Sequence, residues 1–208
     1  MIVKILRIDS SILGEHSASR ELTGAIVDKL KSDLPDAEIV TRDLVADGLT
    51  HAVPATLPSA HPLSQMAGPL EGDAALGRAA SDALLEEFLA ADVVVIGAPM
   101  YNFTIPTHLK AWIDRILVPG TTFGYSEQGP TGLMGAKRVI IAITRGGFYG
   151  PGTAQAAVEH GDSYLRAALG FIGIANPEII IAEGLAVSEE QKAIAKAQAN
   201  EAIQALAA

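Results

Sequence analysis

The chain contains no cysteine, which excludes several kinds of site before any motif is considered. Disulfides, thiolate nucleophiles, iron–sulfur clusters and cysteine-ligated zinc all need that residue. A cysteine-dependent phosphatase, which would also place a phosphate loop after its first strand, is excluded for the same reason. His51 and His61 lie in a loop without an acidic partner at ligand spacing, so we expect no metal site.

Positive charge is also scarce, because 15 Lys and Arg residues are outnumbered by 24 Asp and Glu residues, for a formal net charge of -9. Nucleic acids and anionic membranes are bound through clusters of cationic side chains, so neither partner is expected. Residues 1–8 include Lys4 and Arg7 and are too short and too charged for a signal sequence. No apolar run is long enough to span a bilayer, and we expect a cytoplasmic protein.

What the chain does have is enough apolar material for one buried core, since 49% of its 208 residues are hydrophobic. We expect residues 1–208 to form a single domain. Apolar, branched runs predict strands at residues 2–8, 91–97, 138–144 and 178–182, and alternating apolar and polar residues predict a less buried strand at 38–44. Helical spacing predicts helices after the first strand, over 73–90, 107–118 and 153–172, and after Ser188.

Strands that alternate with helices indicate an α/β three-layer sandwich with a five-stranded parallel sheet, for which we expect strand order 2-1-3-4-5. Ser188 and Gln191 form a capping box at the start of the last helix. Residues 51–72, rich in Pro, Ala, Ser and His, show no periodicity. A long loop of this kind is a lid, a binding loop or a subunit contact.

In such a sheet a ligand binds outside the carboxyl ends of strands 1 and 3, where the winding direction reverses. The loop after the first strand brings the hydroxyls of Ser11, Ser17 and Ser19 to the start of a helix, an arrangement typical of phosphate binding. The alternative is that Ser17 only caps the helix. The loop lacks the glycine patterns of dinucleotide and triphosphate sites, so a mononucleotide is the better hypothesis.

Two further loops follow the third and fourth predicted strands. Residues 97–106 concentrate Met100, Tyr101, Asn102 and Phe103, which indicates a surface for a flat ring, although Met100 and Phe103 would also suit a core. Residues 144–152 are rich in glycine, which lets backbone amides approach a ligand closely.

With these loops the chain resembles the FMN-dependent NADH azoreductases, also described as NADH:quinone oxidoreductases of flavodoxin-like fold. The resemblance covers nearly the whole chain. It is carried by SSIL at 10–13, SAS at 17–19, APMYNF at 98–103 and TRGG at 144–147, with echoes in LGFIG at 169–173 and AEG at 182–184.

The resemblance implies a bound FMN. Its phosphate would be held by Ser11, Ser17, Ala18 and Ser19, and its ring system by Met100, Tyr101, Asn102, Phe103, Thr144, Arg145, Gly146 and Gly147. Family members are homodimers with active sites at the interface, and Tyr125 and Phe171 match positions that cover the neighbouring subunit's flavin. Thr144 stands where serine is frequent, and it keeps the hydroxyl. Phe148 and Tyr149 enlarge the loop after the fourth strand, so acceptor preference depends on them and on residues 51–72.

The reaction that the resemblance implies is a ping-pong transfer of two electrons from NADH or NADPH to a quinone or azo compound. FMN carries that chemistry, so no catalytic acid or base is assigned among the residues. The substrate would be bound by Asn102, Tyr125, Phe148, Tyr149 and Phe171. Two alternatives stay open: a flavodoxin-type electron carrier, and a non-catalytic regulatory module of the same fold.

Overall fold

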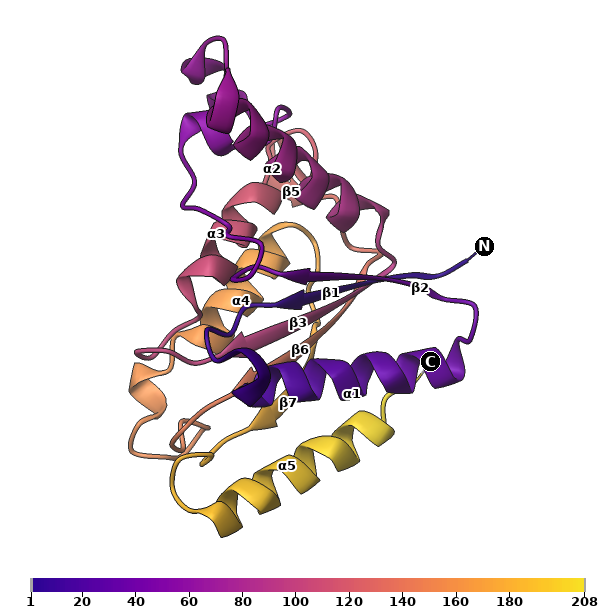
Figure 1. Ribbon diagram of the computed structural model, residues 1–208, viewed down its shortest axis with the longest axis vertical. Helices are drawn as coiled ribbons and strands as arrows, with labels where there is room; N and C mark the ends of the chain where they lie inside the picture. Colours follow the sequence, from indigo (N-terminus) through magenta and orange to yellow (C-terminus); the bar gives the residue numbers. More distant parts are fainter. Residues whose placement is uncertain (1, 208) are drawn as a thin grey trace.

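The computed structural model describes residues 2–207 and contains the parallel five-stranded sheet that the sequence predicts (Figure 1). Its strands are β1 (Lys4–Asp9), β2 (Glu38–Asp43), β3 (Val93–Pro99), β6 (Arg138–Thr144) and β7 (Glu178–Ala182). They lie in the order β2-β1-β3-β6-β7, and every pairing is parallel. The winding direction therefore reverses between β1 and β3, as expected.

Helices cover both faces of the sheet (Figure 1). One face carries α1 (Ala18–Asp33) and α5 (Glu189–Gln204), and the other carries α2 (Gly72–Ala90), α3 (Thr107–Ile116) and α4 (Gly161–Phe171). Side chains of β3 alternate between two separate apolar cores, with Val94 and Ile96 in one and Val93 and Val95 in the other. All seven residues of β3 are buried, which explains its uninterrupted apolar sequence.

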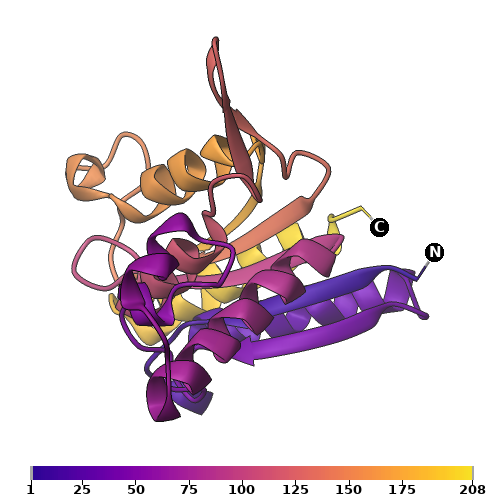
Figure 2. The same ribbon diagram turned by 90° about the horizontal axis from the view of Figure 1, so that it is seen from above.

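An antiparallel hairpin outside the sheet is a feature that the sequence analysis did not predict. It consists of β4 (Phe123–Ser126) and β5 (Gly129–Gly132), and it projects from the body of the molecule (Figure 2). The hairpin packs tightly at its base, because a Cβ added at Gly132 would lie 2.1 Å from the backbone nitrogen of Gly173. A side chain at position 132 would separate the hairpin from the end of α4.

The predicted helix over residues 153–172 is wrong at its start, because α4 begins only at Gly161. Residues before it form turns and one short 3-10 helix, Ala156–Val158. The carboxylate of Glu159 accepts hydrogen bonds from the amides of Gly161 and Asp162, each at 2.9 Å, and so caps the helix at that point. Residues 153–160 form a mostly exposed loop rather than a helix.

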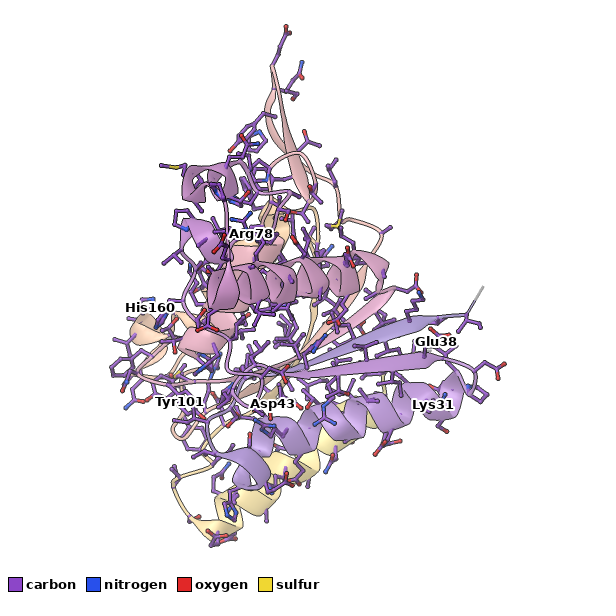
Figure 3. All side chains as sticks on the ribbon, turned by 45° about the horizontal axis from the view of Figure 1, so that its top comes forward. Lys31, Glu38, Asp43, Arg78, Tyr101 and His160 are labelled. Carbon is purple, nitrogen blue, oxygen red and sulfur yellow. The ribbon has the colours of Figure 1, made fainter. Side chains whose placement is uncertain are left out.

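Residues 51–72, for which no periodicity was found, form two short 3-10 helices, Pro54–Thr56 and Pro62–Ala67, that are fastened to α2. The Arg78 side chain donates to the carbonyls of Pro54 at 2.8 Å and Ser64 at 3.0 Å (Figure 3). Arg115 of α3 is buried beneath them and donates to the Ser81 hydroxyl at 2.7 Å. Burial lowers the pKa of Arg115, which has no carboxylate partner among the described residues.

Candidate functional site

A cavity of about 340 Å³ opens at the carboxyl ends of the strands, between the loops that follow β1, β3, β6 and β7. Of the predicted cofactor residues, it is lined by Ser11, Ser17, Ala18, Met100, Tyr101, Thr144, Arg145 and Gly146. Ser19, Asn102, Phe103 and Gly147 are not part of its lining. Three loops that are far apart in the sequence therefore meet where the reversal of winding predicts a ligand.

The first loop ends at the amino terminus of α1. Ser17 is the capping residue, and its hydroxyl accepts from the Arg20 amide at 3.3 Å. The same hydroxyl lies 3.0 Å from that of Ser19. Within the described part of the chain, the amides of Ala18 and Ser19 have no acceptor. Ser17 thus caps the helix, and it also belongs to a group of buried donors with which the positive end of the helix dipole favours an anion.

Arg20 fixes the first loop to the end of β2. Its guanidinium forms a two-pronged ion pair with Asp43, with one contact at 2.8 Å, and donates to the Ser11 carbonyl at 3.0 Å. The hydrogen bonds from Arg20 lower the pKa of Asp43, and those to Asp43 raise the pKa of Arg20. Because this charge is balanced by Asp43, Arg20 acts as a brace for the loop.

The second loop is a two-residue turn. Tyr101 and Thr104 exchange two backbone hydrogen bonds, at 2.9 and 3.2 Å, around Asn102 and Phe103. Both central residues have left-handed backbones, with φ of 48° and 75°, as a type I′ turn requires. Asn tolerates this conformation, whereas Phe does so only at a cost, and such strain collects at functional sites.

The second loop also contacts the first, because the Tyr101 hydroxyl lies 2.9 Å from the Ser11 hydroxyl. Tyr101 reaches this position from the strand-end edge of the molecule, at the opposite end of the sheet from Glu38 (Figure 3). Phe103 is 48% exposed, so the interpretation of this side chain as core is wrong.

The third loop continues side by side with the segment after β7. The Arg145 amide donates to the Ala182 carbonyl at 2.9 Å, and the Gly146 carbonyl accepts from the Ala186 amide at 2.9 Å. No acceptor for the amides of Gly146 and Gly147 exists among residues 2–207. The loop therefore offers two backbone donors at the edge of the cavity.

Arg145 has a structural use that its sequence position did not reveal. Its guanidinium is 3% exposed and lies 3.3 Å from Glu159 and 3.2 Å from Glu183. Glu183 also accepts from the Tyr149 amide at 3.1 Å. One buried arginine therefore joins the third loop to the cap of α4 and to the end of β7, and its charge is already balanced.

None of the five residues predicted to bind substrate lines the cavity. Asn102 lies in the strained turn, and Phe148 and Tyr149 lie in the third loop, where the Tyr149 ring centroid is 6.3 Å from that of Phe103. Tyr125 and Phe171 lie elsewhere, on the hairpin and at the end of α4. Both pack on Phe123, with ring centroids 5.6 and 4.6 Å away, and Tyr125 is 73% exposed.

Several cavity residues were missed by sequence reasoning, namely Leu13, His16, Pro99, Leu185, Ala186 and Lys192. Leu185 and Ala186 could have been found, because they follow the fifth predicted strand and all carboxyl ends of a parallel sheet meet at one edge. Lys192 lies inside α5, and no sequence pattern marks it.

The comparisons with known proteins agree with this geometry. A family model described as a flavodoxin-like fold matches residues 3–206. A protein from Methylobacterium radiotolerans, named FMN-dependent NADH:quinone oxidoreductase, is 59% identical over 206 residues, which cover 99% of this chain and all of that protein. The chain belongs to this flavodoxin-like family. A family member from Methylorubrum populi with the same name is 53% identical, again over 99% of this chain and all of that protein.

Two solved structures are also similar to this chain. An azoreductase from Bacillus anthracis strain Sterne has a TM-score of 0.82 and 29% identity, covering 99% of this chain and 100% of its own. An FMN-dependent NADH-azoreductase from the Ames Ancestor strain, in complex with FMN, has a TM-score of 0.83 and 26% identity, with 100% of both chains covered. No helix in residues 2–207 has the length and apolar character needed to cross a membrane.

Proposed function

We propose that the protein is an FMN-dependent oxidoreductase that uses NADH to reduce quinones and azo compounds. The observation that carries the proposal is the pattern of unpaired donors around the cavity. The free amides of Ala18 and Ser19 lie at its α1 end beside the hydroxyls of Ser17 and Ser19, and the free amides of Gly146 and Gly147 lie at the β6 end. FMN has a phosphate at one end and a polar ring edge at the other, so these donors fit it.

When bound, FMN would supply the transfer of an electron pair, accepted as hydride from NADH and delivered to the second substrate in a ping-pong cycle. The chain's own residues hold and tune that group. The start of α1 would bind the phosphate, because the free amides of Ala18 and Ser19 are fixed donors and the two neighbouring serine hydroxyls can turn to add to them. The amides of Gly146 and Gly147 would stabilise negative charge on the reduced flavin.

The strained turn gives the ring system a fixed wall. Tyr101 and Thr104 close the turn with two backbone bonds, and Tyr101 is held to Ser11 of the phosphate loop. The backbone around Asn102 is therefore positioned relative to the phosphate before the cofactor arrives. Phe103 and Tyr149 lie beyond it as an aromatic rim for flat substrates.

The same proposal includes a homodimer with active sites at its interface. Tyr125 and Phe171 form an aromatic surface that does not reach the cavity of their own chain. In a dimer these side chains would cover the neighbouring subunit's flavin and, with it, sandwich a flat nicotinamide or quinone. Exposed aromatic surface of this kind is typical of interfaces.

Initial-velocity measurements test the reaction. FMN-loaded protein is assayed with NADH and a soluble quinone, each varied at several fixed concentrations of the other. A ping-pong enzyme gives parallel lines in double-reciprocal plots. NADH consumption that occurs only when a protein electron acceptor is added would contradict the proposal and favour the electron carrier, and intersecting lines would contradict the ping-pong order.

A further inference from the structure

The proposed flavin site contains little uncommitted positive charge for a phosphate that carries about -1.5 to -2. Among the side chains that line the cavity, those able to carry positive charge are His16, Arg145 and Lys192. Arg145 is already bound by Glu159 and Glu183. Arg20, close to the loop, is paired with Asp43. Of the lysine and arginine side chains in this group, Lys192 is the one least neutralised by neighbouring carboxylates.

The packing of α5 against α1 places Lys192 beside the phosphate loop. Both helices follow strands of one parallel sheet and therefore begin at the same edge of it (Figure 1). An ion pair between Lys196 of α5 and Glu21 of α1, at 2.5 Å, shows which residues of the two helices lie side by side. One helical turn spans about 3.6 residues. Lys192 precedes Lys196 by about one turn, and Ser17 and Ala18 precede Glu21 by about one turn. Lys192 therefore lies beside Ser17 and Ala18, and all three residues line the cavity.

The existing partner of Lys192 does not hold it firmly. Its ammonium group lies 3.5 Å from the carboxylate of Glu189, three residues earlier in the same helix, and that carboxylate side chain is 91% exposed. Exposed ion pairs of this type contribute about 0 to 1 kcal/mol. The Lys192 side chain, 41% exposed, is therefore free to turn toward an anion in the cavity.

We propose that Lys192 is a phosphate-binding residue of the flavin site, and that the anion is held between the starts of α1 and α5. This inference rests on the proposed function, since it assumes that the cavity takes FMN with its phosphate at Ser17. The chemistry is a charge-assisted contact from the ammonium group to a phosphate oxygen. No proton or electron moves in this step.

The test compares FMN with riboflavin, which lacks the phosphate, by titration of flavin-free protein and quenching of flavin fluorescence. Lys192→Met is expected to weaken FMN binding about tenfold and to leave riboflavin binding unchanged. Lys192→Arg restores FMN affinity. Lys196→Met is the matched control, because it removes a lysine of the same helix that is committed to Glu21, and its FMN affinity stays within about twofold of the parent.

The other possible results distinguish a failure of the proposed flavin site from a failure of the inference about Lys192. If the parent protein binds riboflavin as tightly as FMN, the phosphate site itself is wrong and the inference falls with it. If the parent prefers FMN and Lys192→Met keeps the whole preference, the inference is overturned while the proposed function stands. Equal losses of FMN and riboflavin affinity in Lys192→Met would assign the lysine a structural role and would also overturn the inference.

Discussion

The loops at the strand ends and the β4–β5 hairpin differ in what holds them. The loops are tied together inside one chain, through contacts from Arg20 to the Ser11 carbonyl, from Tyr101 to Ser11 and from Arg145 to two glutamates. The hairpin rests on its own chain only at its base, and Tyr125 is 73% exposed. The difference fits the proposal of a cofactor site built by one chain and a substrate site completed by a second one.

The strongest test of the strand-end loops is the double substitution Ser17→Ala with Ser19→Ala. Each serine is expected to donate to a charged phosphate, so FMN affinity falls about a hundredfold when both hydroxyls are removed. Fluorescence titration of the flavin-free protein measures the change. Ser163→Ala, an exposed serine in the first turn of α4, is the control and leaves the affinity unchanged. An unaltered FMN affinity in the double variant would show that the phosphate does not bind at this loop.

The β4–β5 hairpin is tested by Tyr125→Ala. Loss of an aromatic contact with a flat substrate is expected to lower kcat/KM for the quinone about tenfold, while FMN affinity stays within about twofold. Leu133→Ala, at an exposed apolar position just after β5, is the matched control and leaves both values near those of the parent. A loss of FMN affinity in Tyr125→Ala, without a change in quinone kinetics, would mean that the two regions are not separate.

The strained turn offers a test that separates stability from activity. Phe103→Gly and Phe103→Ala both remove the exposed ring and lower quinone turnover. Only glycine adopts the φ of 75° freely, so Phe103→Gly is expected to be about 1 kcal/mol more stable than Phe103→Ala. Urea unfolding of the flavin-free proteins measures this difference. Equal stability of the two variants would show that the turn relaxes when the ring is absent.

The smallest expected effect concerns the ion pair between Arg20 and Asp43, which fixes the first loop to the end of β2. Because Arg20 lowers the pKa of Asp43, the pair stabilises the fold fully above the ordinary aspartate pKa of about 3.9. That contribution is lost as the pH falls through the lowered value. The free energy of unfolding of Asp43→Asn should therefore approach that of the parent below about pH 4. A gap that stays constant from neutral to acidic pH would contradict this account of the brace.

Much of this architecture could be predicted from the sequence because its signals are local. The run at 138–144 reads as a buried strand by composition alone, and β6 has those bounds. The predicted Ser188 cap is present, with its hydroxyl accepting from the Gln191 amide at 3.0 Å. The cavity position follows from the order of the strands, which needs only their number and alternation.

The features that were missed depend on tertiary contacts. The hairpin strands have only four residues each, and β5 contains Gly129, Pro130 and Gly132, residue types that are depleted in strands. Arg145 was assigned to the ligand because its two partners, Glu159 and Glu183, are distant in the sequence. Lys192 reaches the cavity only through the packing of α5 on α1.

The central claim is that the strand-end cavity binds FMN for two-electron transfer, and anaerobic half-reactions test it most directly. FMN-loaded protein is mixed with one equivalent of NADH without oxygen, and the visible absorbance of the flavin is followed. We expect the absorbance to be lost without a one-electron intermediate, and to return when one equivalent of quinone is added. A flavin-free protein that takes up no FMN, or a bound flavin that NADH leaves oxidised, would contradict the account.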